Sequence, residues 1–191
     1  MPKFFVFDVG LIDVQPRIWR RFMLAQKATF GDLHRSIQDS FGWKDYHAWE
    51  FRLPNGDPIA ALVDDMGKGS TPDGEQLRLT RYFTGEGVCE WCEYCYDFRD
   101  DWVHEVKLVD LAVEEESFER KLLGGSRSCP PEDCGGSAGY AELVQFLRTG
   151  RPPPGKNPAE IEQRLGQWQK DAFDAVEAAR TFAQGRSAPR V

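Results

Sequence analysis

One short stretch constrains the fold of this chain more than any other: the loop over residues 129–136, which reads Cys-Pro-Pro-Glu-Asp-Cys-Gly-Gly. Each of its two prolines fixes its own φ angle and holds the residue before it in extended geometry. Two carboxylates, Glu132 and Asp133, follow the prolines, and a glycine pair leads into the next segment. We therefore expect a stiff lead-in to a helix, folded back against the middle strands of the chain.

The 191 residues suit one domain over residues 1–150, followed by a proline-rich linker, a C-terminal helix and a frayed tail over 151–191. A hydrophobic content of 41% is enough to bury a core. No segment reaches the ~18 apolar residues of a membrane span, and the first ten residues lack the pattern of a signal peptide. Five cysteines without an export signal predict a cytoplasmic protein with reduced thiols and no membrane association, with metal binding as the rival use of the thiols.

The net charge of -7 is concentrated in the middle of the chain. Residues 86–119 contain 12 acidic and 2 basic side chains, a local net charge of -10. Such a surface opposes docking on nucleic acid, because contacts to phosphate supply most of the non-specific affinity. It suits a cation or a basic partner, and the alternative is a solvated acidic face with no partner.

Alternating apolar residues and turn signals predict several strands. They are placed at residues 3–13, 18–25, 47–53, 88–99 and 102–113. The first two form a hairpin, and the last two are hinged at Asp100 and Asp101. Residues 64–74 are predicted as an exposed loop, and residues 76–83 as a short strand or a helical turn.

The clearest helix is predicted over residues 30–41, where apolar side chains recur at helical spacing. Thr29 is placed as its N-cap, with Asp32 as the partner in a capping box. Gly42 follows as a residue able to end the helix in the left-handed conformation.

Two further helices are predicted in the last third of the chain. One is capped by Ser137 and turns its inner face toward the core through Tyr140, Leu143, Val144 and Leu147. The other is a long amphipathic helix over residues 158–184, whose apolar face packs on the domain or on a second copy of the chain. Strand connections too short for parallel crossovers then predict an α+β fold: a mainly antiparallel sheet with helices packed on one face.

Three segments, in this order and spacing, carry a resemblance to a known family. They are Ile18-Trp19-Arg20-Arg21 with Leu33-His34 and Phe41-Gly42-Trp43-Lys44-Asp45-Tyr46-His47; Tyr96-Asp97-Phe98 with Asp100-Asp101-Trp102 and His104; and Arg127 with residues 129–136 and Gly139-Tyr140. On these residues the chain resembles the plasmid pRiA4b ORF-3-like family over roughly residues 3–150.

The resemblance implies an α+β protein without an established activity, and a label that links some members to plasmids and mobile elements, even to a transposon resolvase. The residues themselves give that label little support, because the one serine beside an arginine that resembles a recombinase pair, Ser36, lies within the predicted helix. Leu122 stands where many relatives have a cysteine, and Arg99 where they have glycine. These departures weaken any metal site that depends on a fixed set of thiols.

Polar residues form one candidate site. Its members are His47, Asp97, Asp100, Asp101, His104, Glu132, Asp133 and Tyr140. A divalent-metal-dependent hydrolase would draw its ligands from Asp97, Asp101, His104, Glu132 and Asp133. Carboxylate oxygens with one imidazole suit manganese, iron or zinc, and a metal so held lowers the pKa of a bound water.

The structural alternative accounts for the same residues. Asp100 and Asp101 can make a bulge or turn between strands. His104 shares strand parity with Trp102, which points it into the core, and His47 shares its face with apolar neighbours in the same way. If the two histidines meet, a buried polar network anchored by Asp97 or Asp133 would result.

Thiols and glycines provide weaker candidates. Cys89, Cys92 and Cys95 have the spacing of a metal-binding tract, but residues three apart on a strand point to opposite faces. Cys129 and Cys134 can pair or bind zinc, although two thiols fall short of four ligands, and otherwise they are packed thiols. The glycine pair before the helix can cradle phosphate, but the preceding Glu132 and Asp133 would repel it and are expected to bond to the helix amides instead.

The sequence therefore favours a non-catalytic binding or interaction module that acts through a protein or small-ligand surface. The alternatives are the metal-dependent hydrolase and a nucleic-acid-associated accessory protein. No cofactor other than a divalent metal is indicated, and the C-terminal helix is the predicted surface for a homo-oligomer.

Overall fold

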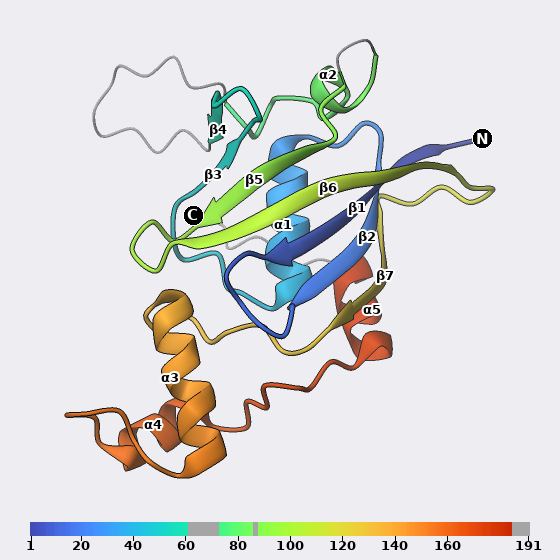
Figure 1. Cartoon of the computed structure of the whole chain (residues 1–191). Helices are drawn as coiled ribbons and strands as arrows, with labels where there is room; N and C mark the ends of the chain where they lie inside the picture. The colour runs from blue at the N-terminus through green and yellow to red at the C-terminus, as the bar shows by residue number, and fades with distance from the viewer. Residues whose placement is uncertain (61–72, 86–87, 185–191) are drawn as a thin grey trace.

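A computed structural model describes residues 1–60, 73–85 and 88–184 (Figure 1). Within these residues, seven strands form one antiparallel sheet in the order β4-β3-β5-β6-β1-β2-β7. The strands are β1 (Lys3–Leu11), β2 (Trp19–Ala25), β3 (Trp49–Arg52), β4 (Pro58–Ala60), β5 (Trp91–Tyr96), β6 (Trp102–Val113) and β7 (Arg120–Ser126). The predicted α+β class is confirmed.

The helices of the described residues are α1 (Phe30–Phe41), α2 (Thr80–Phe83), α3 (Gly136–Thr149), α4 (Pro158–Leu165) and α5 (Ala175–Gln184). Figure 1 shows α1 and α5 against the same face of the sheet, whereas α3 and α4 lie together beyond one end of it. Among the described residues, no helix has both the length and the apolar content needed to cross a membrane.

The strand predictions agree with the structure where alternation is strong. The N-terminal hairpin forms, and the strand over residues 102–113 is confirmed along its whole length. The strand expected at 47–53 is shorter, so that His47 precedes β3 instead of lying on it. The stretch 76–83 contains the helical turn α2 and no strand. The loop expected at 64–74 lies largely outside the described residues, as does the expected frayed tail.

Two strands, β4 and β7, have no clear signal in the sequence. β4 contains only three residues, and β7 includes the pair Gly124 and Gly125, which weakens any strand signal. Gly125 has a steric role, because a Cβ built there would lie 2.7 Å from both the Arg20 side chain and the ring of Phe173. Only glycine lets these two side chains approach the strand so closely.

The single long helix predicted over residues 158–184 is wrong. Gly166 ends α4, and its N–H donates to the carbonyl of Glu162 at 2.9 Å. A new helix starts after Asp174, whose side chain accepts N–H bonds from the first turn of α5. The intervening segment packs Trp168 and Phe173 against the body of the protein, contacts that a straight helix could not make.

The helix after the proline loop also differs in detail. It begins at Gly136, with Gly135 as N-cap in the left-handed conformation, so Ser137 is not its cap. Its buried face contains Tyr140 and Leu143, as predicted, but Phe146 takes the inward position expected for Leu147, which is exposed. Val144 lies at the edge of the core.

The main core lies between the helix-covered face of the sheet and α1. Phe5, Phe7 and Val9 of β1 meet Leu33 and Ile37 of α1 there. Successive β1 residues point to opposite faces, so the other set forms a second, smaller cluster on the far face. In that cluster Phe4 stacks on Phe118 at a centroid distance of 4.1 Å, which buries β1 on both faces.

The capping box predicted for α1 is present. Thr29 Oγ1 accepts from the N–H of Asp32 at 3.1 Å, and Asp32 Oδ2 accepts from the N–H of Thr29 at 2.9 Å. Gly42 closes the other end with φ 88° in the left-handed region. Local sequence therefore determines both ends of the helix that supports the core.

Replacing Thr29 with alanine should lower the free energy of unfolding by about 1 kcal/mol, because one N-terminal amide of α1 loses its acceptor. Urea titration should show this as a lower midpoint with an unchanged m-value. Thr29→Ser keeps the hydroxyl and is the control. Equal midpoints for the alanine variant and wild type would contradict the assignment.

Candidate functional site

The loop over residues 129–136 folds back against the end of β5 and the turn that follows it. Glu132 Oε1 accepts from the N–H of Lys44 at 2.7 Å and from the hydroxyl of Tyr96 at 3.2 Å. The N–H of Gly135 donates to Asp100 Oδ2 at 2.9 Å. Glu132 and Asp133 were expected to accept bonds from the amides at the start of α3, but Asp100 accepts the N–H of the N-cap residue Gly135 instead. The N-cap residue has no side chain with which to cap the helix.

The loop brings one histidine and two aspartates together. His47 Nε2 lies 3.2 Å from Asp133 Oδ1 and 3.6 Å from Asp97 Oδ2. The three come from the segment before β3, the turn after β5 and the proline loop. Asp97 and Asp133 both have positive φ angles, 56° and 53°, which aspartate tolerates better than most residues.

His104 does not join this cluster. Its Nδ1 donates to the carbonyls of Trp102 and Tyr94, at 3.0 and 3.2 Å, and its Nε2 is buried without a hydrogen bond. The rings of Phe41 and Trp43 meet it edge-on. Burial lowers the pKa of His104 to about 4, so the imidazole is neutral at physiological pH. His104 therefore occupies the core position that strand parity predicted.

The remaining predicted site residues are dispersed. Asp101 accepts a hydrogen bond from the thiol of Cys95 at 3.2 Å. Cys95 points to the face of β5 opposite to Tyr96, the residue that bonds to the loop. Tyr140 packs edge-on against Trp168, in the C-terminal part of the chain. The hydrolase built from Asp97, Asp101, His104, Glu132 and Asp133 is therefore not assembled as one centre.

The cysteines are all unpaired and mostly buried. Cys92 and Cys95 point to opposite faces of β5, as strand geometry predicts. Burial raises the pKa of Cys134 to about 12, and it also raises the pKa of Cys129 well above its usual value. Both thiols of the loop are therefore protonated and act as packing groups.

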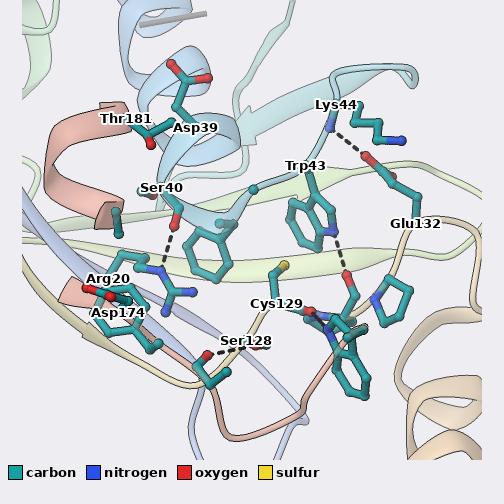
Figure 2. A pocket seen from close by; sticks show the side chains of 18 of the residues that line it. Arg20, Asp39, Ser40, Trp43, Lys44, Ser128, Cys129, Glu132, Asp174 and Thr181 are labelled. Carbon is teal, nitrogen blue, oxygen red and sulfur yellow. Dashed lines mark hydrogen bonds between the residues drawn. The ribbon is translucent and has the colours of Figure 1, made fainter. Parts of the chain in front are cut away.

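A cleft of about 790 Å³ opens on the other side of the loop (Figure 2). Its walls come from the end of α1 and the residues after it, from residues 128–132, and from the chain between Arg164 and Thr181. Trp168 forms part of the wall and donates from its indole N–H to the carbonyl of Cys129 at 2.7 Å. The break between α4 and α5 thus supplies one side of the cleft.

Arg20 lies at one end of the cleft, as Figure 2 shows, and is only 2% exposed. Its guanidinium donates to the carbonyls of Ser40, Trp19, Ser126 and Arg127 at 2.7 to 3.0 Å. The ring of Phe173 lies 4.3 Å from its central carbon and the ring of Phe41 lies 5.0 Å away. Burial lowers the pKa of Arg20 to about 10, so it still carries its charge at neutral pH.

Arg20 belongs to the segment that carries the family resemblance, and the sequence also contains a signal for its inward position. In β2 it shares parity with Phe22 and Leu24, both of which are buried in the core. Strand alternation alone therefore turns this arginine inward. No such signal exists for Trp168 and Phe173, because both residues lie within the segment 158–184 that was predicted as one helix.

Comparisons with known proteins agree with the resemblance read from the sequence. The family model for plasmid pRiA4b ORF-3-like proteins matches residues 3–179, well past the point where the resemblance was expected to end. The uncharacterized protein y4hQ of Sinorhizobium fredii is 29% identical over 176 residues, covering 92% of this chain and 85% of that protein. A crystal structure of a protein of unknown function, MM3350 of Methanosarcina mazei Go1, matches with a TM-score of 0.79 and 30% identity, over 93% of this chain and 97% of that one.

The position of His104 generates a pH prediction. The pKa is about 4 in the folded protein and about 6.5 in the unfolded chain, so between these values only the unfolded state binds the proton. Stability should therefore fall as the pH drops from about 6.5 to 4, by up to roughly 3 kcal/mol. Urea unfolding across this range measures the slope. His104→Gln should remove it and His47→Gln should retain it; equal slopes in wild type and His104→Gln would refute the assignment.

Proposed function

Since the chain belongs to the plasmid pRiA4b ORF-3-like family, and the relatives described above carry no stated activity, we propose a function from the geometry of the cleft. The protein is a non-catalytic binding module, and the cleft takes a small organic anion with an aromatic or apolar body. The observation that carries this proposal is the buried charge of Arg20.

That charge lacks a counter-ion of its own. Among the described residues, no carboxylate forms an ion pair with Arg20, and its hydrogen-bond acceptors are neutral carbonyls. Burying a cation against neutral dipoles alone costs free energy, which an approaching anion lowers. A ligand carboxylate at this end of the cleft would supply the missing charge.

The rim of the cleft also contains positive charge. Lys44 and Arg164 line it and have no ion pair within the described ranges. Four acids also line it: Asp39 pairs with Arg120 at 2.5 Å and Glu177 with Arg180 at 3.1 Å, whereas Glu132 and Asp174 accept backbone N–H bonds. Lys44 and Arg164 together with the buried Arg20 are the positive groups that would attract an anionic ligand.

The size and composition of the walls favour a small molecule. A cavity of about 790 Å³ falls within the ~300–1,000 Å³ range of ordinary ligand pockets. Leu165, Trp168 and Phe173 supply apolar surface, and the ring of Phe173 lies against the buried guanidinium. An aromatic or aliphatic body can therefore pack on the wall while its anionic group faces the arginine.

The other functions considered have weaker support. The hydrolase is not proposed, because His104 lies in the core, away from the carboxylates meant to act with it. A nucleic-acid-associated role rests on the plasmid label of the family, while the acidic stretch over 86–119 opposes it.

Isothermal titration calorimetry with 3-phenylpropionate, and with its neutral amide, tests the proposal. A hydrogen bond to a charged group contributes about 1.5–3 kcal/mol, so the amide should bind at least about tenfold more weakly than the carboxylate. Absence of saturable binding by the carboxylate at millimolar concentration, or equal binding of both probes, would overturn it.

A matched pair of lysine variants locates the binding. Lys44→Gln removes a rim charge and should weaken binding of the carboxylate by about twofold to fivefold, the size expected for an exposed charge. Lys107→Gln removes a charge from β6, outside the cleft, and should leave the affinity unchanged. Equal effects of the two substitutions would place the binding elsewhere.

A further inference from the structure

A second site, separate from the cleft, is formed by His47, Asp97 and Asp133. Their ligand atoms all lie within 4.8 Å of one another. The imidazole Nε2 is 3.2 Å from one carboxylate oxygen and 3.6 Å from the other. A metal ion with bonds of about 2.0–2.2 Å holds neighbouring ligand atoms roughly 3.0–3.5 Å apart. Two of the three separations therefore nearly match a single coordination sphere already.

The hydrogen bonding of these atoms also favours a bound cation. His47 Nε2 is buried and makes no hydrogen bond, although two carboxylate oxygens lie near it. The side chain of Asp97 is only 5% exposed; its Oδ1 accepts from the N–H of Arg99 at 3.1 Å, and its Oδ2 faces the imidazole. The lone pair of an imidazole nitrogen and those of two carboxylate oxygens are all available to a metal ion. A cation among them would satisfy all three.

The surrounding structure holds the three ligands in place. Asp133 stands on the stiff loop, whose main-chain carbonyls at Glu132 and Asp133 accept bonds from Arg164. The ring of Tyr96 packs edge-on against His47 at 5.7 Å. Such support from neighbouring groups is what a preorganised metal site requires.

We propose that His47, Asp97 and Asp133 bind one divalent transition-metal ion of the zinc or manganese class. One imidazole and two carboxylates match the ligand preference of these ions, whereas magnesium and calcium favour oxygen ligands throughout. Three protein ligands leave at least one position for water or for a group of a ligand, as in open zinc sites. None of the three residues lines the cleft, so this site does not depend on the function proposed above.

Titration of chelator-treated, tag-free protein tests the site, with Zn²⁺ followed by calorimetry and Mn²⁺ by electron paramagnetic resonance. Wild type should bind one equivalent of either ion and bind Mg²⁺ more weakly. Asp133→Asn should weaken binding by at least about tenfold, the loss that even outer-sphere partners of metal ligands produce. Asp133 is 58% exposed, so this variant should keep its fold, and an unchanged melting temperature without metal verifies it.

Asp97→Asn and Asp101→Asn form a matched pair near the site. Both aspartates have left-handed backbone, which asparagine also adopts, but only Asp97 belongs to the three-residue group. The first substitution should weaken Zn²⁺ binding as strongly as Asp133→Asn, and the second should leave it unchanged. No stoichiometric binding by wild type, or binding that survives both Asp97→Asn and Asp133→Asn, would overturn the proposal.

Discussion

The guanidinium of Arg20 connects parts of the molecule that are far apart in the sequence. From β2, the strand next to the edge of the sheet, it donates to the carbonyl of Ser40 near the end of α1 and to those of Ser126 and Arg127 at the end of β7. Phe173, from the segment between α4 and α5, covers one of its faces. A buried charge needs several good acceptors at once, because each lost bond leaves part of it unsolvated. The sheet, the first helix and the C-terminal segment are therefore mutually dependent through this one side chain.

The proline loop lies between the two proposed sites. The part from Cys129 to Glu132 forms a wall of the cleft, while the next residue, Asp133, turns toward His47 and Asp97. Because the loop is bonded to Trp43, Lys44 and Tyr96, its position is set by the core beneath it. The loop therefore supplies one wall of the cleft and one residue of the proposed metal site, and the two sites share no residue.

Much of the local structure was predictable because its causes are local. The capping box at Thr29 and the left-handed stop at Gly42 depend on neighbours within a few residues. Alternation likewise placed His104 in the core, since β6 runs unbroken through it. The prediction of one long C-terminal helix was wrong because its cause is not local. The apolar spacing continues past Gly166, but the packing of Trp168 on the body of the protein outweighs helical continuity.

By itself, the sequence determined the α+β class, the family, the principal strands and helices, and the list of polar residues from which a site is drawn. Tertiary structure alone decided which of those residues meet. Strand parity says whether a side chain points inward, but not which distant side chain it faces, and so it could not select His47 over His104 as the neighbour of Asp97 and Asp133. That choice depends on where the loop docks, which is set by long-range contacts such as the bond from Trp43 to the carbonyl of Pro130.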